Sequence, residues 1–203
     1  MDGVGSTQGG VLVLGATNVP WELDPAMRRR FEKRVYIALP EAPARSTMFK
    51  LNIGDTPNDI TDDQFLEMGV IAEGYSGSDV AVVVREAIME PLRKCQQAKQ
   101  FMINPQDGMI APCSDYPNCP YCPMNLLTQK TGTVFTAAEQ AQNQCQKCGA
   151  IRMSLYDIDT DKLSVPVVVF PDFVKALNKA HGSVATSELL QCVQWTEEFG
   201  QEG

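Results

Sequence analysis

Two short runs of apolar residues, separated by a polar segment, open the chain. Residues 11–17 read VLVLGAT, and residues 34–39 read RVYIAL and are followed by Pro40. Continuous apolar runs of this length are typical of strands that are buried on both faces of a parallel sheet. The segment between them, ELDPAMRRRF, predicts a short helix with Pro25 in its first turn. Two strands and one helix cannot form a sheet with its own core, so we expect residues 1–40 to be the end of a larger α/β domain.

From residue 41 onward the apolar positions recur at helical spacing. Residues 42–53, APARSTMFKLNI, have a proline near the start and Gly54 after the end, which is the usual asymmetry of a helix. Thr61 is expected to begin a second helix. Pro91 is expected to kink a third helix or to begin a new one. This third helix follows the loop EGYSGS, and its predicted apolar face consists of Val80, Val83, Val84, Ala87, Ile88 and Leu92.

The pattern changes again beyond the third helix. Residues 103–150 are rich in Pro, Cys, Gln and Asn and show little apolar periodicity. Residues 150–158, AIRMSLYDI, alternate like a strand, and residues 167–180 predict an extended run followed by a helix. Residues 186–200, TSELLQCVQWTEEFG, predict a final amphipathic helix.

Composition and charge narrow the range of functions. The formal net charge of −8 argues against a nucleic-acid binder, because neutralising phosphates requires a basic face. No apolar run approaches the ~20 residues of a membrane span, and the start of the chain resembles neither a signal peptide nor a transit peptide. We therefore expect a cytoplasmic protein whose thiols stay reduced, so that its seven cysteines favour metal binding over disulfides.

Four of these cysteines form two pairs at metal-binding spacing. CPYC is followed by 22 residues and then by CQKC, which is the pattern of a zinc ribbon. Four thiolates leave no open coordination position, so the predicted zinc is structural and stabilises a polar segment that has few apolar residues. Two alternatives stay open: Cys113 could replace the first ligand, or the pairs could be unbound thiols. The expected ligands are Cys119, Cys122, Cys145 and Cys148.

The order of several motifs carries a family resemblance. ATN follows the first apolar run, LDPAMRRRF comes next, the second run ends in LP, and GYSGSD lies in the helical region. The sequence resembles the meiotic clade of AAA ATPases, and within it the vacuolar protein-sorting ATPases that disassemble ESCRT-III; spastin, katanin and fidgetin are relatives. The resemblance covers residues 1–113 and 149–203. It implies the end of an α/β domain of the P-loop NTPase type (1–40), a small helical lid domain (41–105 and 166–185), an antiparallel β-domain (106–165) and a C-terminal helix (186–203). The zinc-ribbon-like insertion (113–148) in the β-domain departs from the family pattern.

The resemblance assigns roles to three residues near the start of the chain. Asn18 is similar to the family's sensor of the ATP γ-phosphate, and Arg28 and Arg29 are similar to its arginine fingers, with the role of Arg30 left open. A guanidinium group offers planar, permanently charged donors to the charge that develops on the transferred phosphoryl group. Fingers of this kind act on the nucleotide of a neighbouring subunit, which implies a hexameric ring. The alternative is a solvated basic helix end.

In the lid, the resemblance points to two groups of residues that face ATP. Gly54, Asp55 and Thr56 match the segment that lines the adenine pocket. Gly77 and Ser78 match the beginning of a helix that approaches the sugar and phosphates, where free N–H groups and the helix dipole favour an anion. The alternative for this second group is a loop and a helix cap that bind no ligand.

The motifs that hold the phosphates and magnesium in this family are not found in the sequence. The chain contains no GxxxxGK[ST] loop and no apolar run that ends in acidic residues. The family's pore loops and its microtubule-interacting-and-trafficking domain are also missing, so we expect the carboxyl-terminal half of an ATPase, inactive alone.

The resemblance implies that the parent enzyme, with ATP and Mg, disassembles ESCRT-III polymers at endosomes. ESCRT-III subunits, other copies of the chain and a helical activator at the β-domain are the expected partners, and membranes are reached only through partners. The alternative is a non-catalytic, zinc-stabilised interaction module.

Overall fold

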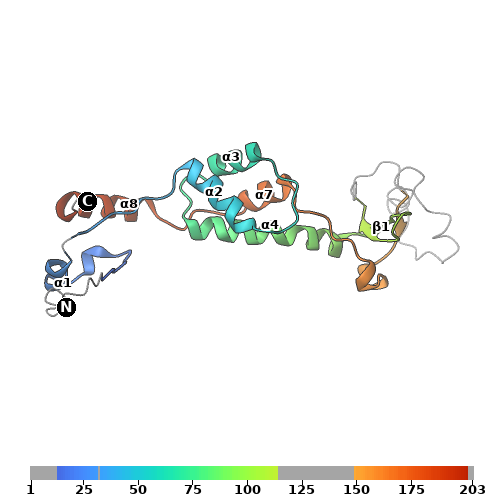
Figure 1. Ribbon diagram of the computed structural model, residues 1–203, viewed down its shortest axis with the longest axis horizontal. Helices are drawn as coiled ribbons and strands as arrows, with labels where there is room; N and C mark the ends of the chain where they lie inside the picture. Colours follow the sequence, from blue (N-terminus) through green and yellow to red (C-terminus); the bar gives the residue numbers. More distant parts are fainter. Residues whose placement is uncertain (1–12, 32, 114–148, 201–203) are drawn as a thin grey trace, which may run out of the picture.

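The computed structural model describes residues 13–31, 33–113 and 149–200. These residues form an elongated molecule with three parts in a row (Figure 1): α1 and α8 at one end, a bundle of four helices in the middle, and a small sheet at the other end. The helices are α1 (Pro25–Arg30), α2 (Ala42–Ile53), α3 (Asp62–Ile71), α4 (Gly77–Gln97), α7 (Phe170–Leu177) and α8 (Thr186–Phe199). The strands are β1 (Gln100–Ile103), β2 (Ile110–Pro112) and β3 (Ile151–Arg152), and the 3-10 helices are η1 (Pro20–Glu22), η2 (Leu155–Asp157) and η3 (Thr160–Lys162).

The two strands predicted at the start of the chain are not formed within the described residues. Residues 13–17 and 34–39 have no regular secondary structure, and the side chains of Leu14 and Ile37 are each 88% exposed. A strand needs a hydrogen-bonded neighbour, and no described segment pairs with either run. The predicted helix between them does form, as α1, and it begins where the carboxylate of Asp24 accepts a hydrogen bond of 2.6 Å from the N–H of Ala26.

The central bundle contains the main hydrophobic core. Helix α2 has the bounds that the sequence pattern predicts, and the rings of Phe49 on α2 and Phe173 on α7 meet edge to face with their centroids 6.0 Å apart. Helix α3 approaches α2 closely at Gly69, where a Cβ atom would lie 2.4 Å from the carbonyl oxygen of Ala42. The core side chains include Phe49, Ile53, Phe65, Met68, Val80, Val83, Val84, Ala87, Phe173, Ala176 and Leu177.

Helix α4 connects the bundle to the sheet (Figure 1). It runs through Pro91 to Gln97, so the predicted alternative of a new helix at Pro91 is wrong. The expected apolar face is buried as far as Ala87, but Leu92 is 40% exposed because the second half of the helix extends beyond the bundle. No helix in the described ranges combines the length and the apolar character that crossing a membrane would require.

The small sheet has strand order β2-β1-β3, and both pairings are antiparallel. Phe101 of β1 is fully buried and lies opposite Pro112 on one side and Ile151 on the other. The strand predicted over 150–158 is much shorter than expected. It ends because Ser154 and Asp157 form a capping box that begins η2 and turns the chain away from the sheet.

Candidate functional site

The basic run of α1 lies against the last turn of α8. The guanidinium carbon of Arg28 is 4.8 Å from the centroid of the Phe199 ring, a cation–π distance. Phe199 in turn packs against Trp195, one helical turn earlier, with ring centroids 5.6 Å apart. Arg28 is half-buried by this contact, whereas Arg29 is exposed. The two predicted fingers therefore differ: Arg28 packs on α8, whereas Arg29 is exposed.

A shallow hollow beside this contact is lined by three arginines. Its lining consists of Pro25, Arg28, Arg29, Arg34 and Phe199. The Nε atoms of Arg28 and Arg34 are buried and have no hydrogen-bond partner among the described residues. Buried donors on like-charged side chains are unfavourable unless an acceptor is supplied, and a carboxylate or phosphate accepts such bonds most strongly. The hollow is therefore suited to an anion.

Asn18 lies outside this hollow. It is exposed and stands one residue before Val19, whose N–H donates a hydrogen bond of 3.1 Å to the hydroxyl oxygen of Thr17. Asn18 does not line the hollow that Arg28 lines.

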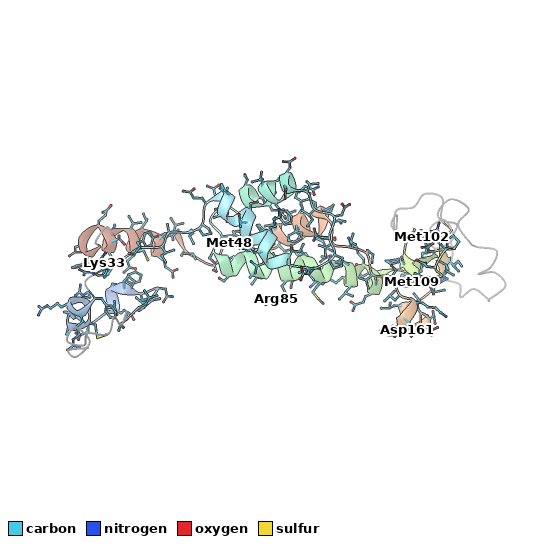
Figure 2. The ribbon with its side chains drawn as sticks, viewed as in Figure 1. Lys33, Met48, Arg85, Met102, Met109 and Asp161 are labelled. Carbon is cyan, nitrogen blue, oxygen red and sulfur yellow. The ribbon has the colours of Figure 1, made fainter. Side chains whose placement is uncertain are left out.

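The two predicted groups of lid residues lie at different points along α2. Gly54 ends α2 with a φ of 54°, a conformation that favours glycine, and Asp55 after it is exposed. Gly77 begins α4 next to the side chain of Met48, which lies within α2 in the central bundle (Figure 2). Met48 and Gly54 are six residues apart, roughly 9 Å along a helix axis. A ligand that touched both groups would have to be elongated, as a nucleotide is.

The beginning of α4 is occupied by its own capping interactions. Asp79 is buried and accepts a hydrogen bond of 2.8 Å from the N–H of Ser76 and one of 3.3 Å from the N–H of Ser183. Burial raises the pKa of Asp79, but the hydrogen bonds from Ser76 and Ser183 outweigh burial, so its pKa lies below the ordinary value. Gly77 and Ser78 stay exposed. These two residues at the start of α4 are therefore accessible to a ligand, whereas Asp79 is not.

Sequence reasoning missed two contacts here. The hydroxyl of Tyr75 donates a hydrogen bond of 2.8 Å to the carbonyl oxygen of Ala180, and Asp79 reaches Ser183. Both attach the GYSGSD loop to the segment after α7. A capping box can be read from the spacing of Ser76 and Asp79, but partners about a hundred residues away leave no local signal. The place of Arg34 in the hollow beside α1 was missed for the same reason.

The four predicted zinc ligands, Cys119, Cys122, Cys145 and Cys148, lie outside the described residues. Within the described ranges, no group of three or more His, Cys, Asp or Glu side chains could hold a metal ion. Cys113, the alternative ligand, is buried at the end of β2, and its N–H donates a hydrogen bond of 3.0 Å to the carbonyl oxygen of Gln100. The zinc site therefore stays a prediction.

Two family models match opposite ends of the chain. The model "Vps4 C terminal oligomerisation domain" matches residues 145–200, and the model "ATPase family associated with various cellular activities (AAA)" matches residues 1–39. The chain is 42% identical over 203 residues to vacuolar protein sorting-associated protein 4B of Mus musculus, covering 100% of this chain and 41% of that protein.

Further relatives agree with these matches. The human vacuolar protein sorting-associated protein 4A is 39% identical over 212 residues, which cover 100% of this chain and 42% of that protein. The chain thus spans about two fifths of the length of these relatives. A crystal structure of the FIGL-1 AAA domain superposes with a TM-score of 0.64 and 28% identity, over 98% of this chain and 48% of that one.

Proposed function

Because this chain belongs to the AAA ATPase family and is of the Vps4 kind, we propose that it supplies the sensor, the arginine fingers and the lid of a hexameric ATPase. The parent enzyme hydrolyses ATP with Mg and uses the energy to take apart ESCRT-III polymers during endosomal sorting. The oligomerisation domain matched by residues 145–200 supports assembly from copies of one chain.

The observation that carries this proposal is the set of guanidinium groups on and beside α1. Arg29 is exposed, and Arg28 and Arg34 line the same hollow with buried Nε atoms that lack hydrogen-bond partners in the described structure. Such donors suit the charge that develops on a γ-phosphoryl group. We propose that the group comes from the nucleotide of the neighbouring subunit, so that Arg28 and Arg29 act in trans.

A mixing experiment with the parent ATPase tests this proposal. A subunit that carries Arg28→Ala and Arg29→Ala keeps its own nucleotide site intact. It lacks the arginine fingers that would act on the nucleotide of the neighbouring subunit. In an Asn18→Ala subunit, the site is defective but the fingers are intact. Each variant alone should lose at least about a hundredfold in turnover. Mixed together they should recover phosphate release, at interfaces that pair intact fingers with an intact site.

The control for charge is Arg85→Ala, which removes an exposed arginine from α4 in the central bundle (Figure 2). This variant should keep turnover near that of the wild type. Turnover unchanged by the double arginine substitution would refute the finger assignment. A mixture as inactive as its two components would refute action in trans.

We also propose that the lid contributes two groups to the ATP site. Gly54, Asp55 and Thr56 face the adenine, and Gly77 and Ser78 face the sugar and phosphates. The exposure of Gly77 and Ser78 at the start of a 21-residue helix supports this, since free N–H groups there favour an anion. Replacing Ser78 by Glu should raise the KM for ATP, through repulsion of the phosphates, with little effect on folding.

The insertion between β2 and β3 is proposed to be a structural zinc site with Cys119, Cys122, Cys145 and Cys148 as ligands. Strands β2 and β3 flank β1 on opposite sides, so the two ends of the insertion lie about two strand spacings apart, ~10 Å. The two ends of the insertion therefore lie at opposite edges of the sheet. The surrounding β-domain is the proposed binding surface for a helical activator.

The chain has a second candidate function. The pair of Cys-x-x-Cys motifs in the sequence favours a non-catalytic, zinc-stabilised interaction module. If this alternative is correct, phosphate release from ATP by any protein that contains the chain will not depend on Arg28 and Arg29. The mixing experiment therefore separates the two functions.

A further inference from the structure

The contact between Arg28 and Phe199 joins residues that are far apart in the sequence. Helix α1 lies near the start of the described chain and α8 at its end, and Figure 1 shows the two helices at the same end of the molecule. The ring of Phe199 lies 4.8 Å from the Arg28 guanidinium, and α8 also contacts η1. The last turn of α8 thus covers one of the two predicted fingers.

The ring that covers Arg28 is itself supported. Trp195 packs against Phe199 at a centroid distance of 5.6 Å and an interplanar angle of 45°. Both residues lie on α8, one turn apart, so the helix backbone holds the two rings in register. An aromatic pair of this kind restricts the Phe199 ring, and a restricted ring offers the guanidinium a fixed surface.

Arg28 has few other described interactions that fix its orientation. Its Nε atom is buried without a hydrogen-bond partner among the described residues, and its neighbours in the hollow include the like-charged Arg29 and Arg34. Long side chains lose considerable rotamer freedom when they are held in one geometry. The Phe199 ring is the attractive contact that offsets the repulsion by the other guanidinium groups.

We propose that Phe199 is a positioning residue for Arg28: its ring orients the guanidinium toward the neighbour's nucleotide, and Trp195 holds the ring. The C-terminal helix thereby sets the geometry of one arginine finger, while Arg29 reaches the nucleotide without this support. The inference rests on the proposed function, because it requires Arg28 to act as a finger. It adds a residue of α8, outside the AAA-matched segment 1–39, to the finger assembly.

The test measures ATP turnover of the parent enzyme at protein concentrations where sedimentation shows each variant to be assembled. Phe199→Ala and Phe199→Leu should lower kcat about three- to tenfold, because a cation–π contact of ~1 kcal/mol is lost. The KM for ATP should stay within about twofold, since neither variant changes the subunit's own nucleotide pocket. Phe199→Tyr keeps the aromatic face and should keep kcat.

A double-substitution cycle ties the effect to Arg28. Adding Phe199→Ala to Arg28→Ala should cause no further loss, because the guanidinium that the ring positions is already absent. An equal loss in both backgrounds would overturn the inference, as would wild-type kcat in Phe199→Leu or failure of Phe199→Ala to assemble at all. Wild-type turnover of Arg28→Ala would overturn the finger assignment itself, and the inference with it. A slow Arg28→Ala enzyme together with a normal Phe199→Ala enzyme would overturn the positioning role alone.

Discussion

The buried carboxylate of Glu90 on α4 forms an ion pair with Lys175 on α7. Arg93 also donates a hydrogen bond of 2.8 Å to Glu90. A second pair runs in the opposite sense: Lys94 of α4 lies 2.6 Å from the buried carboxylate of Asp172 on α7. Each helix therefore contributes one cation and one carboxylate to the two ion pairs. Because both carboxylates are buried, sliding α7 along α4 would leave a buried charge without its partner, and this fixes how the two helices align.

The first prediction concerns acid stability. Burial raises the pKa of Glu90, but hydrogen bonds from Lys175 and Arg93 outweigh burial, so its pKa in the folded chain lies below the ordinary value. A lowered folded pKa means that the contribution to stability is complete above about pH 5 and is lost as the pH falls through the folded pKa. The free energy of unfolding, from urea titrations followed by circular dichroism, should therefore fall below about pH 4.

Glu90→Gln should flatten this acid dependence. The amide cannot be protonated in that range, so the slope of the free energy of unfolding against pH should decrease relative to the wild type. Glu86→Gln is the matched control: Glu86 also pairs with Arg93, at 2.7 Å, but its carboxylate is half-exposed, and its removal should leave the slope unchanged. Equal slopes in the wild type and Glu90→Gln would contradict the prediction.

A second prediction concerns the close approach of α2 and α3. In Gly69→Ala the new methyl would lie 2.4 Å from the carbonyl oxygen of Ala42 and 3.1 Å from the amide nitrogen of Ser46, both backbone atoms that cannot rotate away. The helices must separate, which should cost about 1–3 kcal/mol in the free energy of unfolding. Gly77→Ala is the control, because its methyl would meet only the flexible Met48 at 3.8 Å. It should be neutral within about 0.5 kcal/mol. Similar losses in both variants would show that the packing argument is wrong.

The contrast between α2 and the two N-terminal runs explains how much the sequence could predict. The pattern of residues 42–53 carries its own start and stop signals and its own apolar face, so α2 has the predicted bounds. The runs 11–17 and 34–39 have the composition of strands, but a strand also depends on a partner that local composition does not specify. The same limit applies to the site. The family resemblance predicts Arg28 and Arg29 as fingers from a local motif, whereas the contact of the Phe199 ring with Arg28 depends on the tertiary fold.

A third prediction concerns the attachment of the GYSGSD loop. Tyr75→Phe removes the hydroxyl that donates a hydrogen bond of 2.8 Å to the carbonyl oxygen of Ala180, and it leaves the ring in place. The loss of this hydrogen bond should lower the free energy of unfolding by about 1 kcal/mol, or the Tm by about 2–4 °C. Tyr156→Phe is the matched control, since Tyr156 is 96% exposed and the loss of its hydroxyl should leave the Tm unchanged. An unchanged Tm in Tyr75→Phe would mean that this bond contributes nothing to holding the loop.

The last prediction concerns zinc. The purified chain should contain about one zinc per molecule, because four thiolates from two Cys-x-x-Cys pairs complete a tetrahedral site. Replacing Cys119 and Cys122 by Ser should abolish zinc binding, measured by elemental analysis after gel filtration. Removing the metal with a chelator should expose the insertion to limited proteolysis, since the segment has few apolar residues to hold it folded.

Single substitutions of the other cysteines decide between the two proposed ligand sets. Cys95 is buried in α4 and Cys192 lies on α8, so Cys95→Ser and Cys192→Ser should retain the zinc. Cys113→Ser separates the alternatives: because Cys113 is buried beside β1, this variant should lower the free energy of unfolding but keep the zinc. Loss of zinc in Cys113→Ser, with zinc retained in Cys119→Ser, would instead assign Cys113 as the fourth ligand. Zinc-free wild-type protein whose insertion still resists protease would rule out both ligand sets.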